Sequence, residues 1–261
     1  MPQWLTNGLT VQARVVWALM LREIHTINGK SQLGYLWVLI QSAFGIGVFW
    51  AVREFMGAHA PHGMPVPIFL VAGFAVWGAF SGIVSKSMSA ISANRALLTF
   101  PQVTELDVLL ARLLVITATE LITAVLLIGV AVVLGFDFRP VSASLVLFVI
   151  FSVPFLGLGI GMICSALSVF VPALEKIVPM VLRILFFVSG VFFAVSMFRH
   201  DIAQILLWNP VMQAIEILRT GLHASYVVDG LSPLYLIIVT VSTLTIGGFL
   251  ERYVRRRRID E

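Results

Sequence analysis

The sequence predicts an all-α integral membrane protein with six transmembrane helices, forming a single domain over residues 1–261. Three observations support this fold class. Hydrophobic residues make up 59% of the chain and charged residues 11%, whereas a soluble domain carries about 25% charged residues. Apolar runs long enough to cross a bilayer recur along the chain. These runs are continuous and do not alternate with polar residues, which favours helices over the strands of a membrane barrel.

The first predicted element is an amphipathic helix over residues 9–30. Its apolar face is expected to carry Ala13, Val16, Trp17, Met20, Ile24 and Ile27. The opposite face is expected to carry Gln12, Arg22, Glu23 and His25. Such a helix lies in a membrane interface with its tryptophan near the lipid headgroups. The alternative is an ordinary packed helix of a cytoplasmic cap.

Six runs are long and apolar enough to form transmembrane helices. They cover residues 33–52, 66–88, 110–134, 141–169, 177–197 and 233–250. If the N-terminus is cytoplasmic, the only basic residues in outer segments are Arg53, Arg139, Arg199 and Arg219. Every other Lys and Arg then lies on the inner side. The positive-inside rule therefore predicts that both termini are cytoplasmic, as an even number of spans requires.

A few polar and small residues lie inside these spans. Gly157, Gly159 and Gly161 are expected to allow a close contact between helices. Glu120 and Arg183 are expected within a turn or two of the inner boundary. There each can extend to the interface, pair with an opposite charge or face an aqueous cavity.

The second inner connection contains a predicted short helix over residues 90–100, which Pro101 ends. This helix carries Leu97, Leu98 and Phe100 into the cytoplasm, where they suggest a docking surface. The alternative is that the helix packs back against the bundle. Thr104 and Asp107 then match the start of the next helix, although Asp replaces the preferred Glu or Gln.

The last outer connection, residues 198–232, is unusually apolar for a solvated loop. Asn209 and Pro210 prevent one long helix, so we expect two short helices within residues 202–223. These helices are predicted to dip into the bundle from the outside, where protein or water can satisfy their backbone. Glu216 and Arg219 can pair on one face of the second helix. The alternative is an amphipathic pair that lies on the outer surface.

The sequence contains no recognisable catalytic or cofactor site. Gly29-Lys30-Ser31 resembles the end of a phosphate-binding loop, but position 24 is Ile where that loop needs glycine. Cys164 is the single cysteine, and no Cys and His residues have the spacing of a metal site. We therefore expect that the chain does not hydrolyse ATP, binds no cofactor of its own and is not an enzyme. Nucleic acid is not expected among its partners.

Four motifs together resemble one family. They are Leu-Arg-Glu-Ile at 21–24, Gly-Lys-Ser-Gln-Leu-Gly-Tyr-Leu-Trp at 29–37, Ala-Ile-Ser-Ala-Asn at 90–94 and Leu-Trp-Asn-Pro at 207–210. In this order they resemble the permease subunit of the bacterial capsule polysaccharide exporters. These permeases belong to the type-2 ATP-binding-cassette exporter family, which also includes O-antigen and teichoic acid permeases.

The resemblance implies a homodimer in the bacterial inner membrane, with two separate ATPase subunits that bind ATP and Mg on the cytoplasmic face. It implies that the 90–100 helix couples the permease to the ATPase. The residues expected to carry this contact are Asn94, Arg95, Leu97, Leu98 and Phe100. The two short helices are implied to form an outer gate. Its expected residues are Trp208, Asn209, Pro210, Glu216 and Arg219.

The implied cargo is a polysaccharide on a lipid anchor, passed on to a periplasmic co-polymerase and an outer-membrane export protein. Aromatic faces and hydrogen-bonding groups suit a glycan path. The candidate path residues are Arg22, Lys30, Tyr35, Trp37, Gln41, Phe44, Arg183, Phe186 and Phe193. The alternatives are that the aromatic residues face lipid or anchor the chain at the interface, and that the basic residues only obey the positive-inside bias.

The sequence thus favours the membrane-spanning subunit of an ATP-driven exporter of lipid-anchored capsular polysaccharide. An O-antigen or teichoic acid permease of the same family is the nearest alternative. An ion-coupled secondary transporter and a membrane-embedded enzyme of lipid or glycan assembly are alternatives from other classes. Against the secondary transporter, the sequence shows no paired broken helices within the spans. Against the enzyme, it shows no catalytic constellation.

Overall fold

A computed structural model of the chain describes residues 3–27, 34–55, 57, 61–89 and 103–260. Every regular element in these ranges is helical. The elements are α1 (Gln3–Ile27), α2 (Gly34–Phe55), η1 (Pro61–Gly63), α3 (Val66–Met88), α5 (Glu105–Val133), α6 (Ala143–Phe170), α7 (Leu174–Val188), η2 (Val195–Met197), α8 (His200–Leu207), α9 (Pro210–Leu222) and α10 (Pro233–Asp260). The all-helical fold class is confirmed for this part of the chain.

Four helices are long and apolar enough to cross a membrane: α3, α5, α6 and the Pro233–Val254 part of α10. They coincide with the second, third, fourth and sixth predicted spans. α2 occupies the place of the first predicted span, at 34–55 instead of 33–52. The structure thus supports an integral membrane protein with at least these four crossing helices.

The fifth predicted span, 177–197, is wrong in its extent. α7 runs from Leu174 to Val188 and has 15 residues, which is about 22 Å of helix against a hydrocarbon core of about 30 Å. The chain turns at Gly190, whose φ of +77° suits glycine. The side chain of Met212 from α9 fills the space beside it, so a side chain at position 190 would clash. An apolar sequence run therefore continues past the end of the helix.

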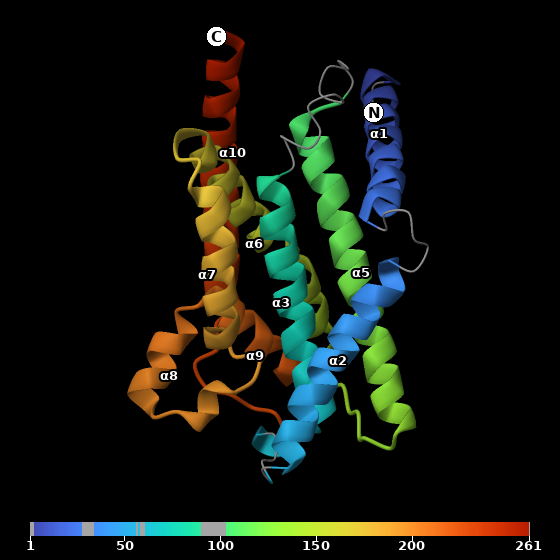
Figure 1. The fold of residues 1–261 in the computed structure, drawn as a ribbon, viewed down its shortest axis with the longest axis vertical. Helices are drawn as coiled ribbons and strands as arrows, with labels where there is room; N and C mark the ends of the chain where they lie inside the picture. Colours follow the sequence, from blue (N-terminus) through green and yellow to red (C-terminus); the bar gives the residue numbers. More distant parts are fainter. Residues whose placement is uncertain (1–2, 28–33, 56, 58–60, 90–102, 261) are drawn as a thin grey trace.

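The helices form a bundle whose two ends differ (Figure 1). α8, α9 and η1 lie at one end, which we call the α9 end. The C-terminus of α10 and helix α1 lie at the other, which we call the terminal end. Both termini are therefore at the same end of the molecule, as an even number of crossings predicts.

Glycine residues bring α6 close to its neighbours. A Cβ added at Gly159 would lie 2.7 Å from the backbone nitrogen of Leu244 on α10, and one at Gly247 would lie 2.9 Å from the carbonyl of Gly159. A Cβ at Gly157 would lie 3.1 Å from the carbonyl of Phe80 on α3. The predicted role of the α6 glycines in close helix contact is confirmed.

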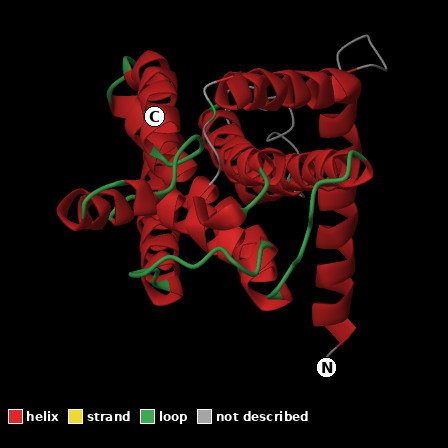
Figure 2. Ribbon diagram, turned by 90° about the horizontal axis from the view of Figure 1, so that it is seen from below, coloured by secondary structure: helices red, strands yellow, loops and turns green. Residues whose placement is uncertain are grey.

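Helix α1 crosses the terminal end of the bundle. Figure 2, which looks along the bundle, shows α1 in nearly full length, so it is steeply tilted from α3 and α5. Glu23 of the predicted polar face is buried and pairs with Arg112 of α5 at 3.1 Å. Trp17 of the predicted apolar face is 60% exposed. The polar face therefore contributes to packing, and the placement of α1 in a membrane interface stays a prediction.

The start of α5 follows the pattern expected from its sequence. The Thr104 hydroxyl accepts a hydrogen bond from the Asp107 backbone at 3.3 Å, and the Asp107 carboxylate accepts one from the Thr104 backbone at 2.9 Å. This reciprocal capping satisfies two amide groups that the helix leaves unpaired. Asp107 also accepts a hydrogen bond from Gln12, which ties α1 to the same point.

Candidate functional site

The two predicted short helices are present, and they differ sharply in burial. All residues of α9 except Pro210 and Thr220 are buried, whereas α8 has no buried residue. Asn209 caps α9, since its side-chain oxygen accepts a hydrogen bond from the Val211 backbone at 3.0 Å. Pro210 occupies the first turn, where a missing N–H costs nothing. α9 is thus packed inside the bundle and α8 lies on its surface, while the predicted entry of the two helices into the membrane from the outside stays a prediction.

A buried ion pair lies on α9. A nitrogen of the Arg219 guanidinium is 3.2 Å from a carboxylate oxygen of Glu216, and both side chains are fully buried. The pairing predicted from the three-residue spacing is therefore confirmed. Burial on this scale is unusual for charged groups, which normally need pairing and further hydrogen bonds to offset the loss of hydration.

Backbone carbonyls supply the further hydrogen bonds of Arg219. It donates to the carbonyl of Phe69 at 3.2 Å, to that of Val191 at 3.0 Å and to that of Phe193 at 3.2 Å. Its guanidinium carbon also lies 3.4 Å from the centroid of the Phe69 ring. One side chain of α9 therefore joins the start of α3 to the segment that follows α7.

Tyr226 completes the network on the carboxylate side. Its hydroxyl donates a hydrogen bond to Glu216 at 2.7 Å, and the Val195 backbone donates to the other carboxylate oxygen at 3.4 Å. Burial raises the pKa of the Tyr226 phenol, so it stays a hydrogen-bond donor. Sequence reasoning missed Tyr226, because it is separated from α9 by a turn and no spacing rule connects it to Glu216.

A second layer of polar contacts covers the network at the α9 end. The His62 ring lies 5.2 Å from the Tyr226 ring in an edge-on arrangement, and its Nε2 is 3.1 Å from the Ser196 hydroxyl. His223 Nδ1 is 2.9 Å from the hydroxyl of Ser225, which donates to the His62 carbonyl. These contacts link the segment before α3 to both sides of α9.

The junction between α8 and α9 is held from the other side. Asn209 donates a hydrogen bond to the Ser189 hydroxyl at 2.9 Å, just where α7 ends. The Trp208 carbonyl accepts one from the Tyr235 hydroxyl at 2.6 Å, although the Trp208 side chain is 77% exposed. Gln213 donates to the Leu207 carbonyl at 3.0 Å. All five predicted gate residues therefore lie in or beside one connected unit at the α9 end.

The structure separates the predicted path residues into different environments. Trp37, Gln41 and Phe44 share one face of α2, with Trp37 67% and Phe44 72% exposed. Phe186 instead packs inward, with ring centroids 5.7 Å from Phe74 and 4.9 Å from Phe192. Within one chain, α2 and Phe186 do not form a common path.

The remaining predicted path residues that the structure describes lie apart from one another, and the predicted coupling residues lie outside the described part of the chain. Phe193 packs edge-on against Phe198 at 5.1 Å near the α9 end. Arg183 is exposed on α7, and Arg22 is half-buried on α1. Lys30 and the side chain of Tyr35 lie outside the described residues, as do all of Asn94, Arg95, Leu97, Leu98 and Phe100.

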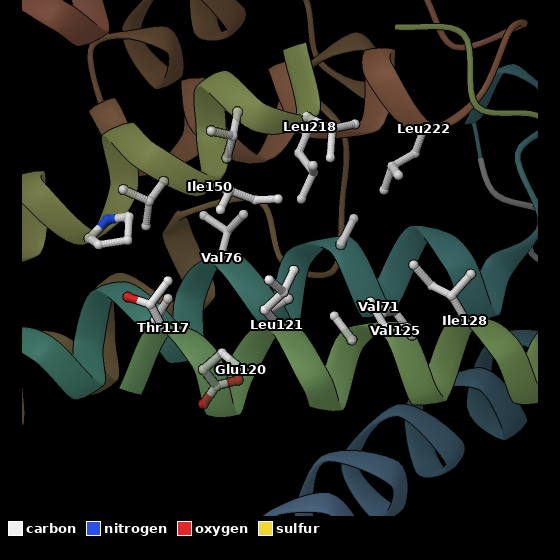
Figure 3. Close-up of a pocket in the computed structure, with 18 of the residues that line it drawn as sticks. Val71, Val76, Thr117, Glu120, Leu121, Val125, Ile128, Ile150, Leu218 and Leu222 are labelled. Carbon is white, nitrogen blue, oxygen red and sulfur yellow. The ribbon is translucent and has the colours of Figure 1, made fainter. Parts of the chain in front are cut away.

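An apolar cavity of about 320 Å³ lies between α3, α5, α6 and α9 (Figure 3). Its wall is almost entirely apolar, and Glu120 and Thr117 of α5 contribute the polar side chains at its edge. Figure 3 shows the Glu120 side chain pointing away from Leu218 and Ile150. Glu120 lies near the middle of α5, and its expected position relative to the inner membrane boundary stays a prediction. α5 begins at Glu105, earlier than the predicted span, which moves Glu120 away from the helix end.

No group of three or more His, Cys, Asp or Glu in the described part of the chain is arranged to hold a metal ion. The hydrogen bonds of Asn209 and Arg219 make the site a structural unit that seats α9 among α3, α7 and the segments around them. The charges of Glu216 and Arg219 are paired with each other. Such pairing suits the stabilisation of one conformation better than proton transfer or nucleophilic chemistry.

The described helices form an apolar bundle typical of an α-helical membrane domain. Residues 14–223 match the ABC-2 type transporter family, and the chain belongs to that family. It is 30% identical to the polysialic acid transport protein KpsM of Escherichia coli over 94% of this chain and 95% of that protein. It is 24% identical to the capsule polysaccharide export inner-membrane protein CtrC of Neisseria meningitidis serogroup B, over 92% of this chain and 91% of that protein. The inner-membrane protein BexB of Haemophilus influenzae, named for the same export, is 27% identical over 92% of this chain and 91% of that protein.

Proposed function

We propose that this chain is the membrane-spanning subunit of an ATP-driven exporter that moves lipid-anchored capsular polysaccharide across the bacterial inner membrane. The observation that carries the proposal is similarity along more than nine-tenths of the chain to proteins named for capsule polysaccharide export. The fold also provides membrane-crossing helices, which such a subunit needs.

The terminal end faces the cytoplasm in this proposal, and the α9 end faces the periplasm. The distribution of basic residues supports this orientation, since Arg53, Arg139, Arg199 and Arg219 are the only Lys or Arg residues assigned to the outer segments. The α8–α9 unit is then an outer gate. Its buried network supports that role, because a gate needs a defined closed position that discrete contacts can hold.

A second copy of the chain completes the permease. Large apolar side chains stay exposed on α2 and α7, which flank α3 in Figure 1. They include Trp37, Ile40 and Phe44 on α2 and Met180, Ile184 and Phe187 on α7. In this arrangement the exposed face of α2, including Gln41, lies on the glycan path between the copies.

Energy comes from two separate ATPase subunits, which bind ATP and Mg at the cytoplasmic face. The 90–100 segment, with Asn94, Arg95, Leu97, Leu98 and Phe100, is the proposed contact. A periplasmic co-polymerase and an outer-membrane export protein continue the route. The ordered motifs and the relatives named for capsule polysaccharide export support these assignments.

A genetic replacement tests the proposal. A strain with this gene deleted should lose its surface polysaccharide and accumulate the polymer inside the cell. Re-expression of the chain should restore display. Expression of R219A instead should give a less stable protein and should restore less surface polysaccharide. Normal surface display in the deletion strain would overturn the proposal.

A further inference from the structure

Arg53 is the one arginine assigned to the outer segments that has no carboxylate partner in the described part of the chain. The other three form pairs, at 2.7 Å for Arg139–Asp137, 3.5 Å for Arg199–Asp201 and 3.2 Å for Arg219–Glu216. Arg53 lies in the last turn of α2. Its neighbour Glu54 is exposed and forms no ion pair with it. The positive charge of Arg53 therefore has no ion-pair partner within the described residues.

The surroundings of Arg53 make a charge without an ion-pair partner costly. Its guanidinium carbon lies 5.3 Å from the centroid of the Phe69 ring, and the guanidinium carbon of Arg219 lies 3.4 Å from the same centroid. Arg53 is only partly exposed, and its Nη1 is buried without a hydrogen-bond acceptor. An aromatic ring attracts a cation but does not satisfy its directed N–H groups.

The nearby acceptors are already in use. One carboxylate oxygen of Glu216 accepts from Arg219 and from the Val195 backbone, and the other accepts from Tyr226. The Phe69 carbonyl accepts from Arg219. Arg219 also adds a like charge beside Arg53. The buried Nη1 of Arg53 therefore keeps N–H groups without an acceptor, and the nearest charge across the Phe69 ring is the like charge of Arg219.

We propose that Arg53 is the core of an anion-binding site at the α9 end, between the ends of α2 and α3. A group that presents two oxygens side by side, either a carboxylate or a phosphate, matches the forked N–H donors of a guanidinium. Two sources carry this chemistry: the acidic sugars of an exported polymer and the phosphate of a lipid headgroup in the outer leaflet. The polymer source rests on the proposed function, whereas the site itself does not.

Binding by the purified full-length chain in nanodiscs tests this site. One arm titrates an oligomer of sialic acid into discs of phosphatidylcholine, with the methyl-esterified oligomer as the uncharged comparison. Trp50, one turn before Arg53, is half-buried and reports binding by its fluorescence. The other arm compares thermal stability in discs of phosphatidylcholine and of phosphatidylglycerol. Each arm uses wild type, R53Q, R53K and the matched outer control R139Q.

The expected result is a loss of anion response in R53Q of about tenfold or more, partial retention in R53K and no change in R139Q. The response should also weaken as salt is added. Dependence of the oligomer arm on Arg53 supports a polymer source, and dependence of the lipid arm supports a headgroup source. Equal responses of wild type and R53Q in both arms would overturn the site.

The outcome is separable from that of the proposed function. Arg53-dependent binding combined with normal capsule display in the deletion strain would leave the site standing and remove the function. Loss of display in the deletion strain combined with Arg53-independent binding would do the reverse.

Discussion

The guanidinium of Arg219 lies 3.2 Å from the carboxylate of Glu216, and neither side chain is exposed to solvent. Three backbone carbonyls and the Tyr226 hydroxyl complete the hydrogen bonding of the pair. The network thereby connects α9 to the start of α3, to the segment after α7 and to the segment before α10. A change in the position of α9 would have to break several of these contacts together.

Removing one member of the pair should destabilise the protein strongly. R219A or E216A leaves a buried charge without its partner, which typically costs about 3–5 kcal/mol. The double variant E216A/R219A should be less destabilised than the sum of the two single changes. Thermal unfolding in detergent measures this cycle. Additive losses would contradict an energetic coupling between the two residues.

The Tyr226 hydroxyl should contribute measurably. Y226F keeps the ring contacts and removes only the donor to Glu216, so we expect a loss of about 1.5–3 kcal/mol. Y235F is the matched control, since it removes a hydroxyl whose acceptor, the Trp208 carbonyl, is in an exposed contact. Y226F should lower the unfolding temperature more than Y235F does. The opposite order would show that Tyr226 is not part of the network that holds α9.

The close contact of α6 with α10 should depend on individual glycines. In G159A the new Cβ would meet the α10 backbone at 2.7 Å, so the helices must separate. A loss of about 1–3 kcal/mol is expected from such overpacking. G248A is the control on α10, because its Cβ would meet nothing within 4 Å. Equal decreases in the unfolding temperatures of the two variants would contradict the close contact between α6 and α10.

The proposed orientation can be read from chemical labelling. C164S removes the single native cysteine and provides a background for new ones. V227C lies at the α9 end at a position that is 62% exposed, and L106C lies at the terminal end at one that is 47% exposed. A membrane-impermeant maleimide added to intact spheroplasts should label V227C and spare L106C. Labelling of L106C alone would invert the topology.

The proposed ATPase contact predicts a specific loss of assembly. L97D/F100D should abolish co-purification of the ATPase subunit, because two charges would enter the apolar docking surface. L106D, an apolar-to-acidic change at an exposed position of α5, should leave co-purification intact. Membrane extracts should contain comparable amounts of both variants. Normal association of L97D/F100D would remove the coupling assignment.

Local patterns predicted much of this fold from the sequence. The four crossing helices follow from long apolar runs, the α5 start follows from Thr104 and Asp107, and the Glu216–Arg219 pair follows from a three-residue spacing. Each of these depends on residues within one helix turn or one continuous run. Such features need no knowledge of what packs against them.

Features that depend on tertiary contact were missed. The end of α7 was not predicted, because residues 189–197 are as apolar as the helix and the turn at Gly190 is supported by Met212 from α9. Tyr226 and the carbonyl of Phe69 reach Arg219 only after folding. The burial of Glu23 likewise required the position of Arg112. Hydrophobicity and spacing contain no information about these partners.

Transport by purified components tests the central claim most directly. Vesicles containing this chain and its ATPase subunit would be supplied with lipid-linked polysaccharide on the face where the ATPase is bound. The account predicts that polymer reaches the opposite compartment only when ATP and Mg are added, and not with an ion gradient alone. Transport driven by an ion gradient in vesicles containing this chain without the ATPase would contradict it.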